Sequence, residues 1–162
     1  MLKIRNIKES EIEFLKDMMY ESIHIPENKP PKEELLNLPH LKKYNENWGR
    51  AGDRALLAED SDGNPLGAAW YRLFNEQNKG YGYVDSFTPE LGIAVSPEAR
   101  GMGIGSLLMK ALIERAKDDG FKGLSLSVDP HNEQAVHVYK KLGFEECGLS
   151  GTSVTMVYDF AE

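Results

Sequence analysis

The alternation of apolar and polar residues predicts a chain that begins with a strand followed by a helix. Residues 2–5 alternate in the way of a short strand with one buried face. The tetrapeptide Ser10–Glu13 has the Ser-x-x-Glu form of a capping box, which marks the start of a helix. Apolar residues at helical spacing follow it, so we expect this helix to run to about Ile23.

The next region contains a loop, a broken helical stretch and two strands. Three prolines in residues 25–31 predict a loop, and the stretch 32–48 has a helical pattern that Pro39 should break. Residues 54–59 and 66–74 are typical of strands. Because an Asp-Gly turn separates them, we expect them to be antiparallel neighbours in a sheet.

A central strand and a long helix are predicted in the middle of the chain. After a polar loop at 75–80, the apolar run Glu90–Val95 favours a central strand. From Gly103 onward, apolar residues recur with the period of 3.6 residues that indicates a helix, until Gly120 stops the pattern. A strand at 124–128 follows at once.

The last part of the chain predicts a helix and two strands. Asn132 is placed as the N-cap of a helix over 133–142, which a glycine ends. Strands are expected from Phe144 onward and over 152–160. The elements together indicate a single α+β domain over residues 1–162 with a mixed sheet, and no repeat or linker interrupts them.

Composition and charge narrow the function classes. Hydrophobic residues make up 41% and charged residues 28% of the chain, as in globular proteins. Apolar runs fall far short of the roughly 20 residues that cross a bilayer, and no signal-peptide pattern precedes the first strand. We therefore expect a cytoplasmic protein with no membrane partner. A net charge of −7 argues against a nucleic-acid partner and is compatible with a cationic amine.

Cysteine and histidine give no sign of a metal or thiol site. Cys147 is the only cysteine, so it forms no internal disulfide, and the neighbouring Glu145 and Glu146 should disfavour its thiolate. The four histidines have no metal-ligand spacing. His131 is expected to be a surface histidine in a turn, with the alternative that it lines the site beside Asn132, and no metal is expected.

The clearest chemical signal is a glycine-rich turn between the central strand and the long helix. Gly101, Gly103 and Gly105 allow backbone N–H groups to approach an anion at a helix N-terminus, where phosphate binds well. A P-loop is excluded because no lysine directly follows these glycines. A dinucleotide fingerprint is excluded because Ser106 or Leu108 stands where its last glycine would be.

The spacing of this turn resembles a known family signature. Arg100, Gly103 and Gly105 match the pattern Arg/Gln-x-x-Gly-x-Gly/Ala, which is similar to the main motif of the GNAT superfamily of acetyl-CoA-dependent N-acetyltransferases. A second pattern, over Asn132–Phe144, resembles the downstream motif of that family. The two motifs and their linking elements cover residues 90–144, about a third of the chain.

The resemblance implies a fold, a reaction and a set of contacts. The fold is α+β, with a mixed, mostly antiparallel, twisted sheet of six to seven strands, about four flanking helices and a V-shaped splay between the central strands. The reaction is transfer of the acetyl group of acetyl-CoA to a primary amine by direct attack in a ternary complex. The residues that would contact acetyl-CoA are Ile93, Ala94, Val95, Arg100, Gly101, Met102, Gly103, Ile104, Gly105, Ser106, Asn132 and Tyr139.

The family also implies what these residues do. Backbone groups of Ile93 and Val95 would pair with the pantetheine arm like another strand, and the N–H groups of residues 100–106 would hold the pyrophosphate. Asn132 would contact the arm of the cofactor. The hydroxyl of Tyr139 would lie near the sulfur.

Two residues are the catalytic candidates. Tyr139 is the candidate general acid for the CoA thiolate, and Glu90 is the candidate base, acting through water. Glu90 shares a strand face with Gly92 and Ala94, whose small size should leave room beside it. The alternatives are that Tyr139 only packs under the sheet, that Glu90 is an ordinary solvated glutamate, or that Asp85 is the base.

Several alternatives stay open on the sequence. The chain could be a catalytically silent acyl-CoA sensor on the same fold or an unrelated phosphate-binding α/β domain, and the donor could carry a longer acyl group. The acceptor is expected to be a small-molecule or peptide amine. No motif identifies it, and none distinguishes a monomer from a homodimer.

Overall fold

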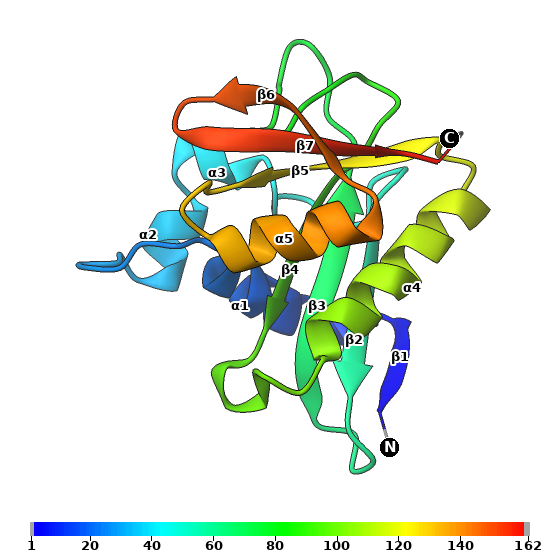
Figure 1. Ribbon diagram of the computed structural model, residues 1–162. Coiled ribbons are helices and arrows are strands. Elements are labelled where there is room, and N and C mark those ends of the chain that lie inside the picture. The colour runs from blue at the N-terminus through cyan, green and yellow to red at the C-terminus, as the bar shows by residue number, and fades with distance from the viewer. Residues whose placement is uncertain (1, 161–162) are drawn as a thin grey trace. The chain divides into compact units, whose positions relative to one another are not determined.

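Seven strands and five α-helices lie within residues 2–160, the part of the chain that the computed structural model describes (Figure 1). None of the helices in this part is long and apolar enough to cross a bilayer. The elements are, in chain order, β1 (Lys3–Asn6), α1 (Ile12–Ser22), α2 (Lys32–Leu36), α3 (Pro39–Lys42), β2 (Arg54–Glu59), β3 (Pro65–Arg72), β4 (Glu90–Val95), α4 (Ile104–Asp118), β5 (Gly123–Val128), α5 (Glu133–Leu142), β6 (Glu145–Ser150) and β7 (Ser153–Asp159).

The capping box before α1 differs from the prediction. Ser10 was the expected cap, but it lies inside a short 3-10 helix, Glu9–Glu11. The carboxylate of Glu11 instead accepts the backbone N–H of Lys8 at 2.8 Å. Glu11 is held in this position by Arg5, whose guanidinium donates to it at 2.7 Å. The ion pair between Arg5 and Glu11 therefore favours a capping box at Lys8 over the predicted one at Ser10.

The stretch 32–48, expected to be one interrupted helix, contains α2 and α3, but the helical prediction is wrong for residues 43–48, which form turns. Pro39 is the first residue of α3, and Leu38 before it is extended, with φ −62° and ψ 141°. Proline has no N–H to continue a helix and forces the preceding residue out of helical geometry. This split gives five α-helices instead of about four.

The strands form one mixed sheet in the order β1-β2-β3-β4-β5-β7-β6. β1 is antiparallel to β2, and β7 is antiparallel to both β5 and β6. β4 and β5 are parallel, and their ladder consists of the single pair Glu90 and Ser125. The predicted α+β fold with a mixed, seven-stranded sheet is confirmed. The V-shaped splay beyond that pair stays a prediction.

Contacts within the chain divide it into two compact units. Unit 1 contains the residues up to Trp70 together with Gly92–Leu112. Unit 2 contains Tyr71–Leu91 and the residues from Ile113 onward. β3, β4 and α4 contribute residues to both units. The single domain expected over residues 1–162 stays a prediction.

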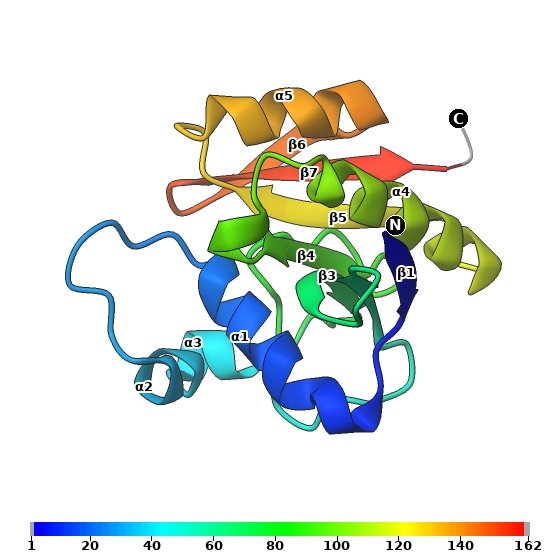
Figure 2. The same ribbon diagram turned by 90° about the horizontal axis from the view of Figure 1, so that it is seen from below.

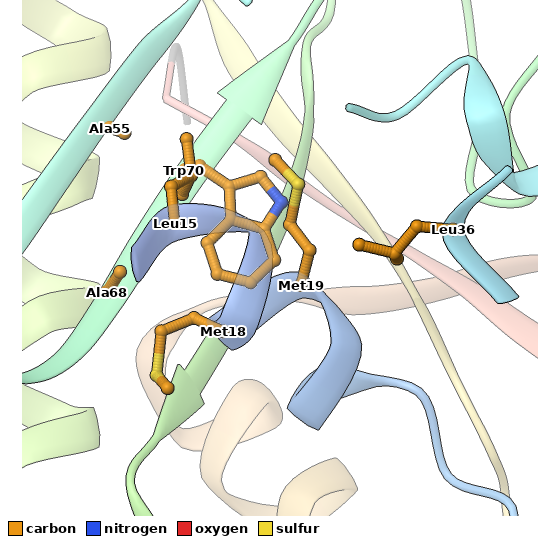
Figure 3. Close-up of a cluster of buried hydrophobic side chains, with 7 residues drawn as sticks. All are labelled: Leu15, Met18, Met19, Leu36, Ala55, Ala68 and Trp70. Atoms are coloured by element: carbon orange, nitrogen blue, oxygen red, sulfur yellow. The ribbon is translucent and has the colours of Figure 1, made fainter. Parts of the chain in front are cut away.

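In unit 1, α1 lies on one face of β3 and β4, and the first turns of α4 lie on the other (Figure 2). Figure 3 shows the Trp70 indole surrounded by side chains of α1. Burial of such side chains contributes about 1.5–3 kcal/mol each, which fixes the helix on the strands. The cluster consists of Leu15, Met18, Met19, Leu36, Ala55, Ala68 and Trp70.

In unit 2, α5 covers one face of β5, β7 and β6 (Figures 1 and 2). A series of edge-to-face aromatic contacts joins this helix to β7. The Tyr139 and Phe144 ring centroids are 6.1 Å apart, and those of Phe144 and Tyr158 are 5.5 Å apart. Gly143, which ends α5, has a φ of 121°, where glycine is favoured.

Candidate functional site

The glycine-rich turn before α4 has the geometry of an anion site. Gly101 and Gly103 have φ values of 83° and 76°, in the left-handed region that favours glycine. α4 begins at Ile104, and its first backbone hydrogen bond runs from Leu107 N–H to Gly103 C=O, at 3.3 Å. The N–H groups of residues 104–106 therefore have no acceptor within the helix, and they point out of its N-terminus.

The space beside this turn is open. A Cβ added at Gly101 or Gly103 would have no atom within 4 Å, so side chains there would fill the space through which a ligand approaches. Gly105 differs, because it is helical without a positive φ and its Cβ would lie 4.0 Å from Val95 Cγ2. An alanine at 105 would make ordinary contact, which agrees with the Gly/Ala choice at that motif position. The residues of the turn thus fit a bound pyrophosphate.

Arg100 turns its side chain toward α1. Its Nε donates to the carbonyl of Val95 at 3.3 Å, and Nη2 lies 3.4 Å from Glu21 Oε2. Met102, two residues later, leaves 63% of its surface exposed on the turn. Arg100 therefore contributes its backbone to the turn, while its guanidinium ties the turn to α1 within unit 1.

The backbone of β4 is oriented as pairing with the pantetheine arm would require. The N–H of Ser96 donates to Leu66 in β3 at 2.8 Å. Because backbone groups alternate along a strand, those of Ile93 and Val95 point to the edge of β4 away from β3. Ile93, Ala94 and Val95 are all half-buried. The pairing itself stays a prediction.

The predicted site residues are divided between the two units. The turn and the β4 residues Ile93–Val95 lie together in unit 1, whereas Glu90, Asn132 and Tyr139 belong to unit 2. In unit 2, α5 carries two of them. Asn132 is its N-cap, as predicted, and Asn132 Oδ1 accepts the N–H of Ala135 at 3.3 Å. With the oxygen used in capping, the amide Nδ2 is the group with which Asn132 would contact a ligand.

Tyr139 is half-buried on α5, and its ring packs on Phe144 while its hydroxyl stays open. Among residues 2–160, no group hydrogen bonds to this hydroxyl. No fully buried side-chain oxygen in that range lacks a partner, so the hydroxyl oxygen reaches the surface. Burial of the ring raises the pKa of Tyr139 above its usual value, which keeps the phenol protonated. Packing accounts for the ring, and a role of the hydroxyl in the chemistry stays a prediction.

Glu90 is the buried first residue of β4, with 6% of its surface exposed. Its Oε1 accepts the N–H of Gly82 at 3.0 Å, and its backbone pairs with Ser125. The alternative of an ordinary solvated glutamate is therefore wrong. A buried carboxylate held by a backbone donor has the fixed orientation that a base requires. Its role as the base stays a prediction.

One expectation around Glu90 is wrong, and one neighbouring residue was missed. Gly92 does not leave room beside it, because an added Cβ would lie 2.6 Å from the Trp70 indole, which fills that space. Sequence reasoning also missed Gly82. A Cβ there would lie 2.7 Å from the backbone of Leu126, so only glycine brings its N–H to Glu90. The one sign of this contact in the sequence is that Gly82 follows Gly80 two residues later.

Cys147 and His131 have the surroundings that were expected of them. Burial raises the pKa of the Cys147 thiol, so its thiolate is disfavoured as expected, although the cause is desolvation and not the neighbouring glutamates. His131 is exposed in its turn, with Nδ1 3.1 Å from Asp129 Oδ1. Within residues 2–160, no group of three or more His, Cys, Asp or Glu side chains could hold a metal ion.

Comparison with known proteins identifies related sequences. The sequence model of the Acetyltransferase (GNAT) family matches residues 16–144. Mycothiol acetyltransferase of Paenarthrobacter aurescens (strain TC1) is 37% identical over 93 residues, which are 55% of this chain and 26% of that protein. The chain thus spans about a quarter of the length of that curated relative.

Two solved structures have a similar fold. Ribosomal-protein-alanine N-acetyltransferase from Brucella melitensis superposes with a TM-score of 0.70 at 25% identity, over 97% of this chain and 99% of that one. The yncA protein of Salmonella typhimurium, solved with its cofactor acetyl-CoA, gives a TM-score of 0.72 at 17% identity, over 100% and 95% of the two chains. At that identity, the second likeness shows the fold alone.

Proposed function

The chain belongs to the Acetyltransferase (GNAT) family, and from this premise we propose that it transfers the acetyl group of acetyl-CoA to a primary amine. The observation that carries the proposal is the turn at residues 100–106, where two left-handed glycines lead into the N-terminus of α4. Such a turn binds a pyrophosphate through backbone N–H groups. The acetyl-CoA of the yncA structure and the amine acceptor in the name of the Brucella enzyme support the donor and the acceptor class.

Acetyl-CoA, when bound, supplies an acetyl thioester that an amine can attack. The residues of this chain would bind the donor and manage protons. An alkylamine with a pKa of about 10.4 is only about 0.1% neutral near pH 7.4, so the enzyme must help to remove its proton. Glu90 would accept that proton through water. The N–H of Val95, which points away from β3, would donate to the carbonyl oxygen of the thioester.

Tyr139 would supply the second proton. The phenol is protonated at neutral pH, since its ordinary pKa is about 10 and burial raises that pKa further, and its hydroxyl has no partner among residues 2–160. It is therefore able to donate to a departing thiolate. Asn132, at the start of the same helix, would orient the cofactor arm through its side-chain amide.

Thiol release tests the proposed function directly. With acetyl-CoA and a panel of primary amines, we expect amine-dependent release of free CoA thiol above the rate with acetyl-CoA alone, and an acetylated amine of the expected mass. A protein that CoA stabilises against heat but that releases thiol with no amine would be a sensor instead. A protein stabilised by ATP or NAD and not by CoA would contradict the whole proposal.

Replacing Glu90 with glutamine tests the base. The side chain keeps its size and its acceptor for Gly82 but loses the ability to take a proton, so we expect kcat/KM for the amine to fall about tenfold and its acidic limb to disappear. The measurement is kcat/KM from pH 6 to 9. Glu114→Gln, at an exposed position of α4, is the control and should behave as wild type. An intact pH profile in Glu90→Gln would remove Glu90 from the chemistry.

A further inference from the structure

The last turn of α1 is joined to the glycine-rich turn by an ion pair. Arg100 Nη2 lies 3.4 Å from Glu21 Oε2, and in Figure 2 the end of α1 lies next to the green segment between β4 and α4. Both side chains are partly exposed, Arg100 by 59% and Glu21 by 32%. Among residues 2–160, Arg100 is the one group that hydrogen bonds to the Glu21 carboxylate. An exposed pair of this length is weak, so another anion can replace the carboxylate.

Helix stability does not explain a carboxylate at position 21. α1 ends at Ser22, so Glu21 lies in its last turn, which carries partial negative charge and contains no basic residue of its own. A carboxylate there is unfavourable for the helix itself. Lys29 brings a cation to this end of α1, but its Nζ donates to the carbonyl of Tyr20 at 2.8 Å and not to Glu21. Arg100 is therefore the group that holds the Glu21 carboxylate.

The guanidinium of Arg100 lies on the side of unit 1 where the cofactor is proposed to bind. Its Nε donates to the carbonyl of Val95 at 3.3 Å. That carbonyl points to the edge of β4 away from β3, where the pantetheine arm is proposed to pair. Arg100 is also the first residue of the turn that is proposed to hold the pyrophosphate. A guanidinium is a strong, bidentate donor to phosphate, so a cofactor phosphate would attract it.

The charges around the pair let Arg100 exchange one anion for another. Burial is the main cause that lowers the pKa of Lys29, while Glu21 raises that pKa and Arg100 lowers it, so the three charges influence one another. Glu21 thus keeps a cation nearby when Arg100 moves. Glu98, two residues before Arg100, is exposed and forms no ion pair among residues 2–160. Within that range, the Glu21 carboxylate is therefore the anion that competes with a cofactor phosphate for Arg100.

We propose that Glu21 is a positioning residue of the cofactor site, which holds the Arg100 guanidinium away from the cofactor phosphates and so limits the affinity for CoA. This inference rests on the proposed function and adds a control of product release to it. When CoA binds, a phosphate oxygen replaces the carboxylate at Arg100, and the cost of that exchange lowers the apparent affinity. Product release often limits turnover, so weaker binding of CoA favours a faster cycle.

Glu21→Gln tests this role through the dissociation constant of CoA, measured by calorimetry at low and at high salt. Glutamine keeps the size of the side chain and an acceptor oxygen but loses the charge, so Arg100 becomes available to a phosphate. We expect CoA to bind about fivefold more tightly at low salt, which is the upper range for an exposed ion pair. The gain should shrink at high salt. Pantetheine, which lacks the phosphates, should bind equally to both proteins.

A double-mutant cycle shows whether Glu21 acts through Arg100. In an Arg100→Gln background, Glu21→Gln should leave the affinity for CoA unchanged, because the guanidinium that Glu21 positions is gone. A general effect of one negative charge fewer would persist in that background. Glu46→Gln is the matched control, because Glu46 Oε1 lies 3.5 Å from Arg50 Nη2 in a similar exposed pair outside the turn. It should bind CoA as wild type does.

The other outcomes overturn the proposal. Weaker binding of CoA by Glu21→Gln would show that the ion pair pre-forms the turn, and unchanged binding would show that it has no role. Equal tightening for pantetheine, in Glu46→Gln or in the Arg100→Gln background would also contradict the proposal. If the wild-type protein does not bind CoA, the proposed function fails separately. Inorganic pyrophosphate then decides, since the inference is overturned if pyrophosphate does not bind or if Glu21→Gln does not tighten its binding.

Discussion

Tyr139→Phe is expected to lower kcat about 100-fold while leaving the KM for acetyl-CoA nearly unchanged. The variant keeps the ring that packs on Phe144 and loses only the proton that the hydroxyl would donate, and a general acid contributes about 10²-fold or more. Stability should not change, because no group in residues 2–160 bonds to this hydroxyl. The measurement is kcat with the amine saturating, together with thermal denaturation.

The pH dependence of this effect follows from the pKa of Tyr139. Burial raises that pKa above the usual value, so the acid form is complete at neutral pH and is lost only as pH rises through the raised value. The ratio of wild-type to variant kcat should therefore be constant from pH 7 to 9. Tyr158→Phe, which alters a neighbouring aromatic residue, is the control. Turnover equal to wild type across this range, with equal stability, would show that Tyr139 only packs.

Gly103→Ala is expected to weaken CoA binding about 100-fold. With φ at 76°, a non-glycine residue at 103 is strained by about 1–2 kcal/mol. In addition, the new methyl group would stand in the open space beside the turn, where the pyrophosphate is proposed to lie. The strain destabilises the free and the bound protein alike, whereas the methyl group opposes binding only. The loss of affinity is therefore expected to come from the methyl group. The measurement is calorimetric CoA affinity, with thermal denaturation beside it.

Two glycine variants separate strain from blocked access. Gly120→Ala has the same kind of strain, with φ at 89° and open space around the added Cβ, at the end of α4 far along the chain from the turn. It should lose similar stability and keep CoA affinity. Gly105→Ala brings neither backbone strain nor a close contact, so it should bind CoA nearly as wild type does. The assignment of the turn would fail if Gly103→Ala and Gly120→Ala bound CoA equally well.

Local sequence signals predicted most of the fold. Gly120 and Gly143 end helices, Asn132 caps one and Pro39 breaks a helical stretch, and each acts through its own backbone or through neighbours within four residues. The structure confirms these positions. The glycine turn belongs to the same group, since its left-handed geometry depends on Gly101 and Gly103 themselves. Such features can be predicted from the sequence because a few adjacent residues contain their physical cause.

The capping box shows where local signals were insufficient. Ser10 and Glu13 have a suitable spacing, yet Arg5 holds Glu11 and moves the cap to Lys8. Arg5 also binds Glu59 of β2, at 2.7 Å, through the pairing of β1 with β2. An ion pair that spans 54 positions cannot be read from a four-residue pattern.

Spacing and the conformational preferences of single residues were enough to predict the family, the order of most elements and the glycine-rich turn before α4. The surroundings of Glu90, in contrast, depend on the tertiary structure. Strand pairing and loop packing buried its carboxylate and brought the N–H of Gly82 to it. These contacts depend on which distant backbones meet, and that is set by the packing of the whole sheet and not by any local pattern.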